Sequence, residues 1–234
     1  MNKSGQGSVL EPAEFINITY YTDPLCCWSW AMEPVLEHMH TKLGMILRWR
    51  ICMGGLLPGW GLFSDNVNAV SRPVQMGPVW MHASRLANVP INWNLWHFDP
   101  PSSSYPACIA FKSVQLQNEE YAKQFLRMLR TSCMIDGINI SKTKELVQLA
   151  DKLKDSFPHF NTNKFIDDLF NGAGKKAFES DLQEIRQNEI RRFPAFIIRQ
   201  AQRPSLIVTG YKSKEAFAKL IFSNFAVDST KVLN

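Results

Sequence analysis

The segment Asp23–Trp30, DPLCCWSW, decides the fold prediction for this chain. Before it, Phe15–Thr22 (FINITYYT) is rich in β-branched and aromatic residues, which predicts a short buried strand. After it, Cys26–Leu43 predicts a helix, and Met45–Met53 alternates apolar and polar residues as a second strand does. A strand, a helix and a strand in so short a segment predict a βαβ unit with parallel strands.

Strand patterns return near the C-terminus. Ala195–Ile198 and Leu206–Val208 predict two short strands that are close enough to form a hairpin, and Ser213–Phe225 predicts a last amphipathic helix. Between the two halves, helical periodicity dominates from about residue 105 onward.

The order βαβ, helices, ββα predicts an α/β protein with an insertion. Neither half can bury its faces alone, so we expect residues 15–55 and 191–226 to form one sheet-containing domain. Residues 56–190 are then a helical domain inserted between the second and third strands.

Composition and charge argue against several classes of function and partner for this chain. The 26 basic and 21 acidic residues give a formal net charge of +5, and no basic run is long enough to predict nucleic acid as a partner. No apolar run approaches the roughly 20 residues that span a bilayer, and residues 1–14 lack an apolar signal-peptide core. We therefore expect a cytoplasmic protein without a membrane partner. The five scattered cysteines suit neither a disulfide framework nor zinc, and no cofactor or metal is expected.

Cys26 is the candidate nucleophile because it lies where the first strand ends and the helix begins. Free N–H groups and the positive end of the helix dipole favour a thiolate at this position. The sequence therefore predicts a lowered pKa for Cys26. Cys27 points about 100° further round the helix, toward the protein.

The chain resembles the DsbA-like branch of the thioredoxin superfamily, and most closely its cytosolic bacterial members of the FrnE type, which are often named as protein disulfide isomerases. The motifs that carry the resemblance are Asp23-Pro24-Leu25-Cys26, Trp28, Trp30, Pro34, Gly54-Gly55-Leu56, Ser104-Tyr105-Pro106-Ala107, Asp136-Gly137-Ile138-Asn139-Ile140 and Arg192-Phe193-Pro194-Ala195. The resemblance implies a thioredoxin fold, with a mixed sheet and a large all-helical insertion between the second and third strands.

The resemblance also implies site residues. Cys26 would be the nucleophile, a cis Phe193–Pro194 bond would face it and align an extended substrate, and Trp28 would line the substrate-facing rim. Ser29 departs from the family pattern, because the fourth position of C-x-x-C is usually a second, resolving cysteine. Ser29 would instead donate a hydrogen bond to the Cys26 thiolate. A resolving thiol would then have to be Cys27, whose ring with Cys26 would be strained, or Cys52 at the end of the second strand.

The sequence thus predicts a cytosolic DsbA-like thiol-disulfide oxidoreductase that acts through a single cysteine. Its partners would be protein thiols or disulfides, with glutathione as a possible co-substrate. Two alternatives stay open. One is a glutathione-dependent transferase or isomerase of the kappa or hydroxychromene carboxylate isomerase type, which Ser29 favours. The other is a non-enzymatic, protein-binding adaptor with a degenerate redox site, because fold alone does not fix function.

Overall fold

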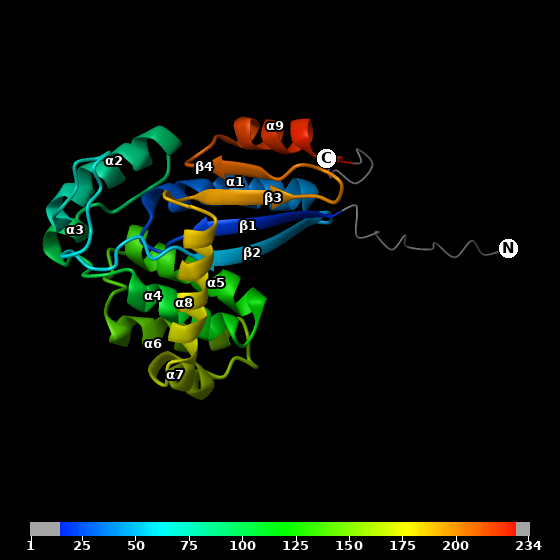
Figure 1. The fold of residues 1–234 in the computed structure, drawn as a ribbon. Helices are drawn as coiled ribbons and strands as arrows, with labels where there is room; N and C mark the ends of the chain where they lie inside the picture. The colour runs from blue at the N-terminus through cyan, green and yellow to red at the C-terminus, as the bar shows by residue number, and fades with distance from the viewer. Residues whose placement is uncertain (1–14, 228–234) are drawn as a thin grey trace.

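A four-stranded mixed sheet forms the centre of residues 15–227, the part of the chain that the computed structural model describes (Figure 1). The strands are β1 (Ile16–Thr22), β2 (Leu47–Met53), β3 (Ala195–Arg199) and β4 (Leu206–Thr209). They lie in the order β2-β1-β3-β4; β1 is parallel to β2 and antiparallel to β3, and β3 is antiparallel to β4. The predicted βαβ unit and C-terminal hairpin are confirmed. The second strand begins at Leu47 rather than at Met45, whose side chain is exposed.

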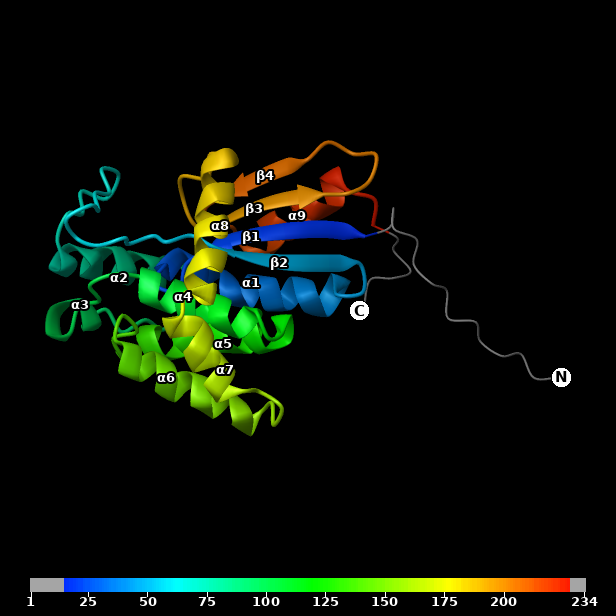
Figure 2. The same ribbon diagram turned by 60° about the horizontal axis from the view of Figure 1, so that its bottom comes forward.

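Helices cover both faces of the sheet. Helices α1 (Cys27–Leu43) and α9 (Lys214–Asn224) lie on one face, and α8 (Ala173–Gln187) crosses the other (Figures 1 and 2). Successive strand residues point to opposite faces. Tyr20 therefore packs in the core on the α1 side, whereas Tyr21 packs with residues of α8.

The segment between β2 and β3 is helical apart from loops and one isolated bridge between Asp65 and Val70. Its elements are η2 (Pro73–Gln75), α2 (Met76–Ala87), α3 (Leu95–Phe98), α4 (Tyr105–Gln115), α5 (Glu119–Met134), α6 (Thr143–Asp151), η3 (Lys152–Asp155), α7 (Thr162–Phe170) and α8. Helices α4 to α7 lie beside the β2 edge of the sheet in both views (Figures 1 and 2). One continuous cluster of buried side chains joins these helices to the sheet, and it includes Ile18, Phe111, Phe125 and Phe165.

A buried ion pair fixes α8 against the end of β2. Asp181 of α8 is 5% exposed, and its carboxylate accepts hydrogen bonds from Lys112 Nζ at 3.0 Å and from the Met53 backbone N–H at 2.8 Å. Nearby, the Tyr21 hydroxyl donates to the Glu184 carboxylate at 2.7 Å. These contacts hold the end of β2, and with it the loop that follows, in a fixed position under α8.

Gly174 of α8 lies where α8 packs closely against α4. A Cβ at this position would lie 2.1 Å from Ser113 Oγ and 3.0 Å from the Ile109 carbonyl oxygen. Glycine to alanine in a helix ordinarily stabilises by roughly 0.5–1 kcal/mol. Here we expect Gly174→Ala to lower the free energy of unfolding by about 1–3 kcal/mol, because the collision forces the helices apart.

Urea unfolding measures this effect. Gly61→Ala is the control, because Gly61 is exposed and an added Cβ there meets nothing within 4 Å. A Gly174→Ala variant as stable as the wild type would show that α4 and α8 separate without cost.

Candidate functional site

Cys26 is the N-cap of α1 and follows the turn Asp23-Pro24-Leu25, which comes directly after β1. Its backbone is extended, with φ −80° and ψ 107°. Its N–H donates to the Asp23 carbonyl oxygen at 3.1 Å, and its own carbonyl accepts from the Trp30 N–H at 3.0 Å, which starts the helix. Only 4% of the residue is exposed. The strand-to-helix position predicted for this thiol is therefore observed, in a more enclosed setting than an open helix terminus.

The Asp23 carboxylate ties the Cys26 turn to two other segments. It is fully buried, and it accepts hydrogen bonds from the Leu25 N–H (2.8 Å), the Leu56 N–H (2.7 Å) and Ser104 Oγ (2.8 Å). Burial raises the pKa of Asp23, although these donors act in the opposite direction. The carboxylate thus joins the start of α1 to the loop after β2 and to the N-terminus of α4.

The peptide bond between Phe193 and Pro194 is cis and faces Cys26. The Cys26 Sγ donates to the Phe193 carbonyl oxygen at 3.6 Å. The Pro194 carbonyl accepts from the Gly210 N–H at 2.8 Å, which attaches this turn to the end of β4. The Phe193 ring rests on Gly54, where an added Cβ would lie 2.4 Å from the ring carbon Cζ. Glycine at position 54 is therefore required for the ring to occupy this place.

Ser29 lies one turn into α1 and is fully buried. Within residues 15–227 its Oγ has no hydrogen-bond partner. The hydroxyl is near enough to the Cys26 thiol to lower its pKa, yet no hydrogen bond of normal geometry joins the two groups. The structure therefore brings Ser29 to Cys26 and leaves its hydroxyl unpaired.

Burial raises the pKa of Cys26 above its ordinary value. The Ser29 side chain, the Ser29 backbone N–H and the charge of Arg130 all lower the pKa, whereas the charge of Asp23 raises it. The prediction of a lowered pKa is thus wrong. Its physical reason is that a nearly enclosed sulfur loses more solvation of the thiolate than the surrounding donors restore.

Arg130 of α5 is the residue that sequence analysis missed. Its guanidinium is fully buried and donates to Thr22 Oγ1, to the Glu33 carboxylate and, at 3.4 Å, to the Tyr20 hydroxyl. The charge lies close enough to lower the pKa of Cys26. A signal was present, because an arginine stands four residues after Leu126 on the apolar face of α5, where a charge is costly unless it is paired.

The two candidate resolving thiols lie in different places. Cys27 is packed in the core on the α1 side, and burial raises its pKa well above the ordinary value. Cys52 is fully buried on the opposite face of the sheet, where its Sγ donates to the Asp181 carbonyl oxygen at 3.7 Å and burial raises its pKa. All five cysteines are free. Cys52 therefore contacts α8 rather than the Cys26 turn.

A cleft of about 840 Å³ opens beside Cys26. Trp28 lines it and contacts Tyr211 and the edge of His82, with ring centroids 6.3 Å and 5.6 Å away. The cleft is further lined by Phe193, by the exposed apolar side chains Leu62, Val67 and Leu86, and by Arg191 and Arg192. Within residues 15–227, no group of three or more histidine, cysteine or acidic side chains could hold a metal ion. The cleft beside Cys26 thus combines apolar side chains with the charged residues Arg191, Arg192 and Asp65.

An N-capping cysteine that faces a cis X-Pro bond before β3, on a sheet of order β2-β1-β3-β4, defines a protein of the thioredoxin fold. The family model described as Thioredoxin matches residues 20–219, and the chain belongs to this family. The resemblance to DsbA-like proteins is confirmed by solved structures.

The structure of a putative protein disulfide isomerase from Nitrosomonas europaea superimposes with a TM-score of 0.72; it is 21% identical, and the match covers 90% of this chain and 97% of that one. The cytosolic disulfide reductase DsbM from Pseudomonas aeruginosa gives a TM-score of 0.64 at 18% identity, over 82% of this chain and 88% of that one. At these identities the likeness shows the fold.

Among curated proteins, the ClpXP adapter protein SpxH of Halalkalibacterium halodurans is 24% identical over 208 residues. The match covers 88% of this chain and 66% of the relative, so this chain spans about two thirds of that protein's length. No helix in residues 15–227 has the length and apolar character needed to cross a membrane.

The effect of Arg130 on Cys26 can be measured by the pH dependence of alkylation. For the wild type, we expect the rate of Cys26 modification by iodoacetamide to increase with pH and its midpoint to lie above about 8.5, the ordinary thiol value. Arg130→Met should raise the midpoint further, because it removes the nearby positive charge.

Two variants serve as controls, with peptide mass spectrometry as the measurement. Arg127→Met removes an exposed guanidinium from the same helix and should leave the midpoint unchanged. Arg130→Lys keeps a positive charge and should shift the midpoint less than Arg130→Met. A wild-type midpoint below the ordinary value, or no response to Arg130→Met, would contradict this account of the site.

Proposed function

We propose that this chain is a thiol-disulfide oxidoreductase that works with the single thiol of Cys26. The observation that carries the proposal is the position of the Cys26 Sγ, 3.6 Å from the Phe193 carbonyl oxygen at the wall of a cleft. An extended polypeptide that pairs with the backbone beside Pro194 would pass directly over this sulfur. The other family features near it, Trp28 and Gly54, line the same cleft.

The proposed reaction has two exchange steps. The Cys26 thiolate attacks a disulfide R–S–S–R′, forming a mixed disulfide Cys26–S–S–R and releasing R′–S⁻. A second thiolate, from glutathione, then attacks the sulfur of R, which forms R–S–S–glutathione and returns Cys26 as a thiolate. The external thiol is required because Ser29 has no sulfur and cannot form an internal disulfide with Cys26. No net electrons remain on the protein after one cycle.

The proposed partners are polypeptides and glutathione in the cytoplasm. The cleft is large enough for several residues of an extended chain, and its apolar lining suits polypeptide side chains. A structure of the fold neighbour DsbM has also been solved with GSH. DsbM is described as cytosolic, which supports the same compartment for this chain.

The proposal is tested by the mass of the intact protein after treatment with oxidised glutathione. We expect one added glutathione, located at Cys26 by peptide mapping, and none on the Cys26→Ala variant. Cys133→Ala is the matched control and should behave as the wild type, because Cys133 is fully buried in the helical core. Loss of two hydrogen atoms without an adduct would reveal a second thiol inside the protein and exclude the single-thiol mechanism.

Restoring the family's second cysteine gives a sharper prediction. Ser29→Cys places a thiol one turn after Cys26, at a position whose present hydroxyl is buried and unpaired. After oxidation we expect this variant to form an internal disulfide and to lose the glutathione adduct. It should also reduce insulin disulfides several-fold faster than the wild type when dithiothreitol supplies electrons. If the variant still carries one glutathione per chain, the side chain at position 29 is not placed to form a disulfide with the Cys26 sulfur, which contradicts the prediction.

A second candidate function is a protein-binding adaptor that does not need the thiol. Two observations favour it: curated relatives are named ClpXP adapter protein SpxH, and burial raises the pKa of Cys26. An adaptor would accelerate degradation of a client protein by purified ClpXP, and Cys26→Ala would do so as well as the wild type. Replacing Leu62 and Val67 by serine should abolish the effect, because these exposed apolar side chains lie at the cleft. Loss of the effect in Cys26→Ala would favour the redox function.

A further inference from the structure

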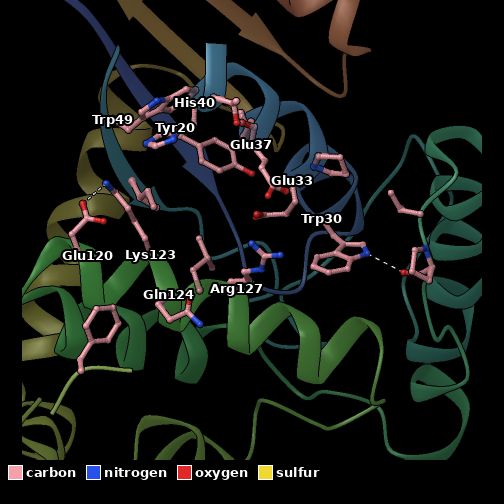
Figure 3. Close-up of a pocket in the computed structure, with 18 residues that line it drawn as sticks. Tyr20, Trp30, Glu33, Glu37, His40, Trp49, Glu120, Lys123, Gln124 and Arg127 are labelled. Carbon is pink, nitrogen blue, oxygen red and sulfur yellow. Dashed lines mark hydrogen bonds and ion pairs between the residues drawn. The ribbon is translucent and has the colours of Figure 1, made fainter. Parts of the chain in front are cut away.

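A second pocket, of about 630 Å³, lies on the α1 face of the sheet, between α1 and α5 (Figure 3). It shares no lining residue with the cleft beside Cys26. Tyr20 of β1 and Trp49 of β2 form its floor, Glu33 and Glu37 come from α1, and Arg127 comes from α5. The pocket is therefore a separate cavity of mixed polarity.

The floor and one end of this pocket are aromatic. The Trp30 indole lies at one end, held by a 2.9 Å hydrogen bond from its Nε1 to the Pro90 carbonyl oxygen (Figure 3). Trp49 Nε1 is buried and has no hydrogen-bond partner within residues 15–227. Aromatic faces of this kind bind apolar groups and cations. The surface thus suits a ligand with an apolar body.

The α1 wall carries Glu33, Glu37 and His40, and the α5 wall carries Glu120, Lys123 and Arg127. Three of these charged side chains are already paired: Glu33 with Arg130, and Lys123 with Glu120 at 2.6 Å. Glu37 and Arg127 make no ion pair or side-chain hydrogen bond in the described part of the chain, and both are exposed. Figure 3 shows them on the α1 and α5 walls respectively. The pocket therefore offers one carboxylate and one guanidinium, across an aromatic floor.

The geometry points to a binding site for a short zwitterionic peptide with apolar side chains. Its ammonium group would lie at Glu37, its carboxylate at Arg127, and its side chains on the partly exposed indoles of Trp49 and Trp30. An extended peptide spans about 3.3–3.6 Å per residue, so a peptide of two or three residues holds its ammonium and carboxylate groups further apart than a single amino acid does and is better suited to reach both walls.

Isothermal titration calorimetry with the tripeptide Leu-Ala-Leu tests this site. We expect saturable binding, and binding roughly threefold to fivefold weaker when the peptide is N-acetylated or C-amidated, because each blocking group removes one partly exposed charge contact. Free leucine should bind more weakly than the tripeptide. All titrations are done on Cys26→Ala as well as on the wild type, so the outcome does not depend on the proposed redox function.

Paired variants identify which wall binds which end. Glu37→Gln should weaken binding of the free peptide by a similar factor but leave the N-acetylated form unchanged, and Arg127→Gln should do the same for the free and C-amidated forms. Glu119→Gln and Arg85→Gln, at exposed positions outside the pocket, are the matched controls and should have no effect.

Four results would overturn the proposal. The first three are no binding at millimolar peptide, equal affinity of the free and blocked peptides, and equal losses from the pocket variants and the control variants. Loss of binding in Cys26→Ala alone would place the peptide in the other cleft and would also overturn it.

Discussion

The hydrogen bonds of the Asp23 carboxylate are the constraint on which the rest of the site depends. A buried carboxylate is costly unless donors surround it, so the chain must bring N–H and O–H groups to this point. The donors come from three segments: the Cys26 turn, the loop after β2, and Ser104 at the start of α4. One side chain therefore fixes the Cys26 turn, the loop that follows Gly54 and Gly55, and the start of α4 relative to one another.

The electrostatic state of Cys26 is a balance between burial and nearby donors. Helix N–H groups and the Arg130 guanidinium favour the thiolate, but the enclosed position of the sulfur outweighs them. The pairing of Arg130 with Glu33 weakens its effect further, because the two charges partly cancel at a distance. The same burial protects the thiol, since oxidation of cysteine follows exposure and thiolate character. A slow, protected thiol is consistent with a site that reacts only when a partner occupies the cleft.

Local patterns in the sequence were sufficient for the sheet, for α1 and for the position of Cys26. Strand alternation, a helix start and the turn before it are all encoded within a few residues. Three features depend instead on contacts between distant parts of the chain. Trp80 of α2 and Trp96 of α3 pack edge to face in the core, with ring centroids 5.1 Å apart, and neither short segment indicates its partner. Arg130 acts on Cys26 across a distance of more than a hundred positions in the chain, and the pKa of Cys26 depends on burial that only the folded protein defines.

Both proposed functions use the cleft beside Cys26, and only the redox function requires the Cys26 Sγ. Binding of a polypeptide depends on the shape and apolar lining of the cleft, on the backbone beside Pro194 and on Trp28, and none of these needs a reactive sulfur. Thiol-disulfide exchange depends on the Cys26 Sγ and on an external thiol, because position 29 carries serine instead of a second cysteine. Substituting the second cysteine by serine removes the internal disulfide while leaving the binding surface intact. A site of this composition would therefore keep a surface for polypeptides while losing an internal disulfide, and fold alone does not decide between the two functions: similar proteins are named both as a disulfide reductase and as an adapter.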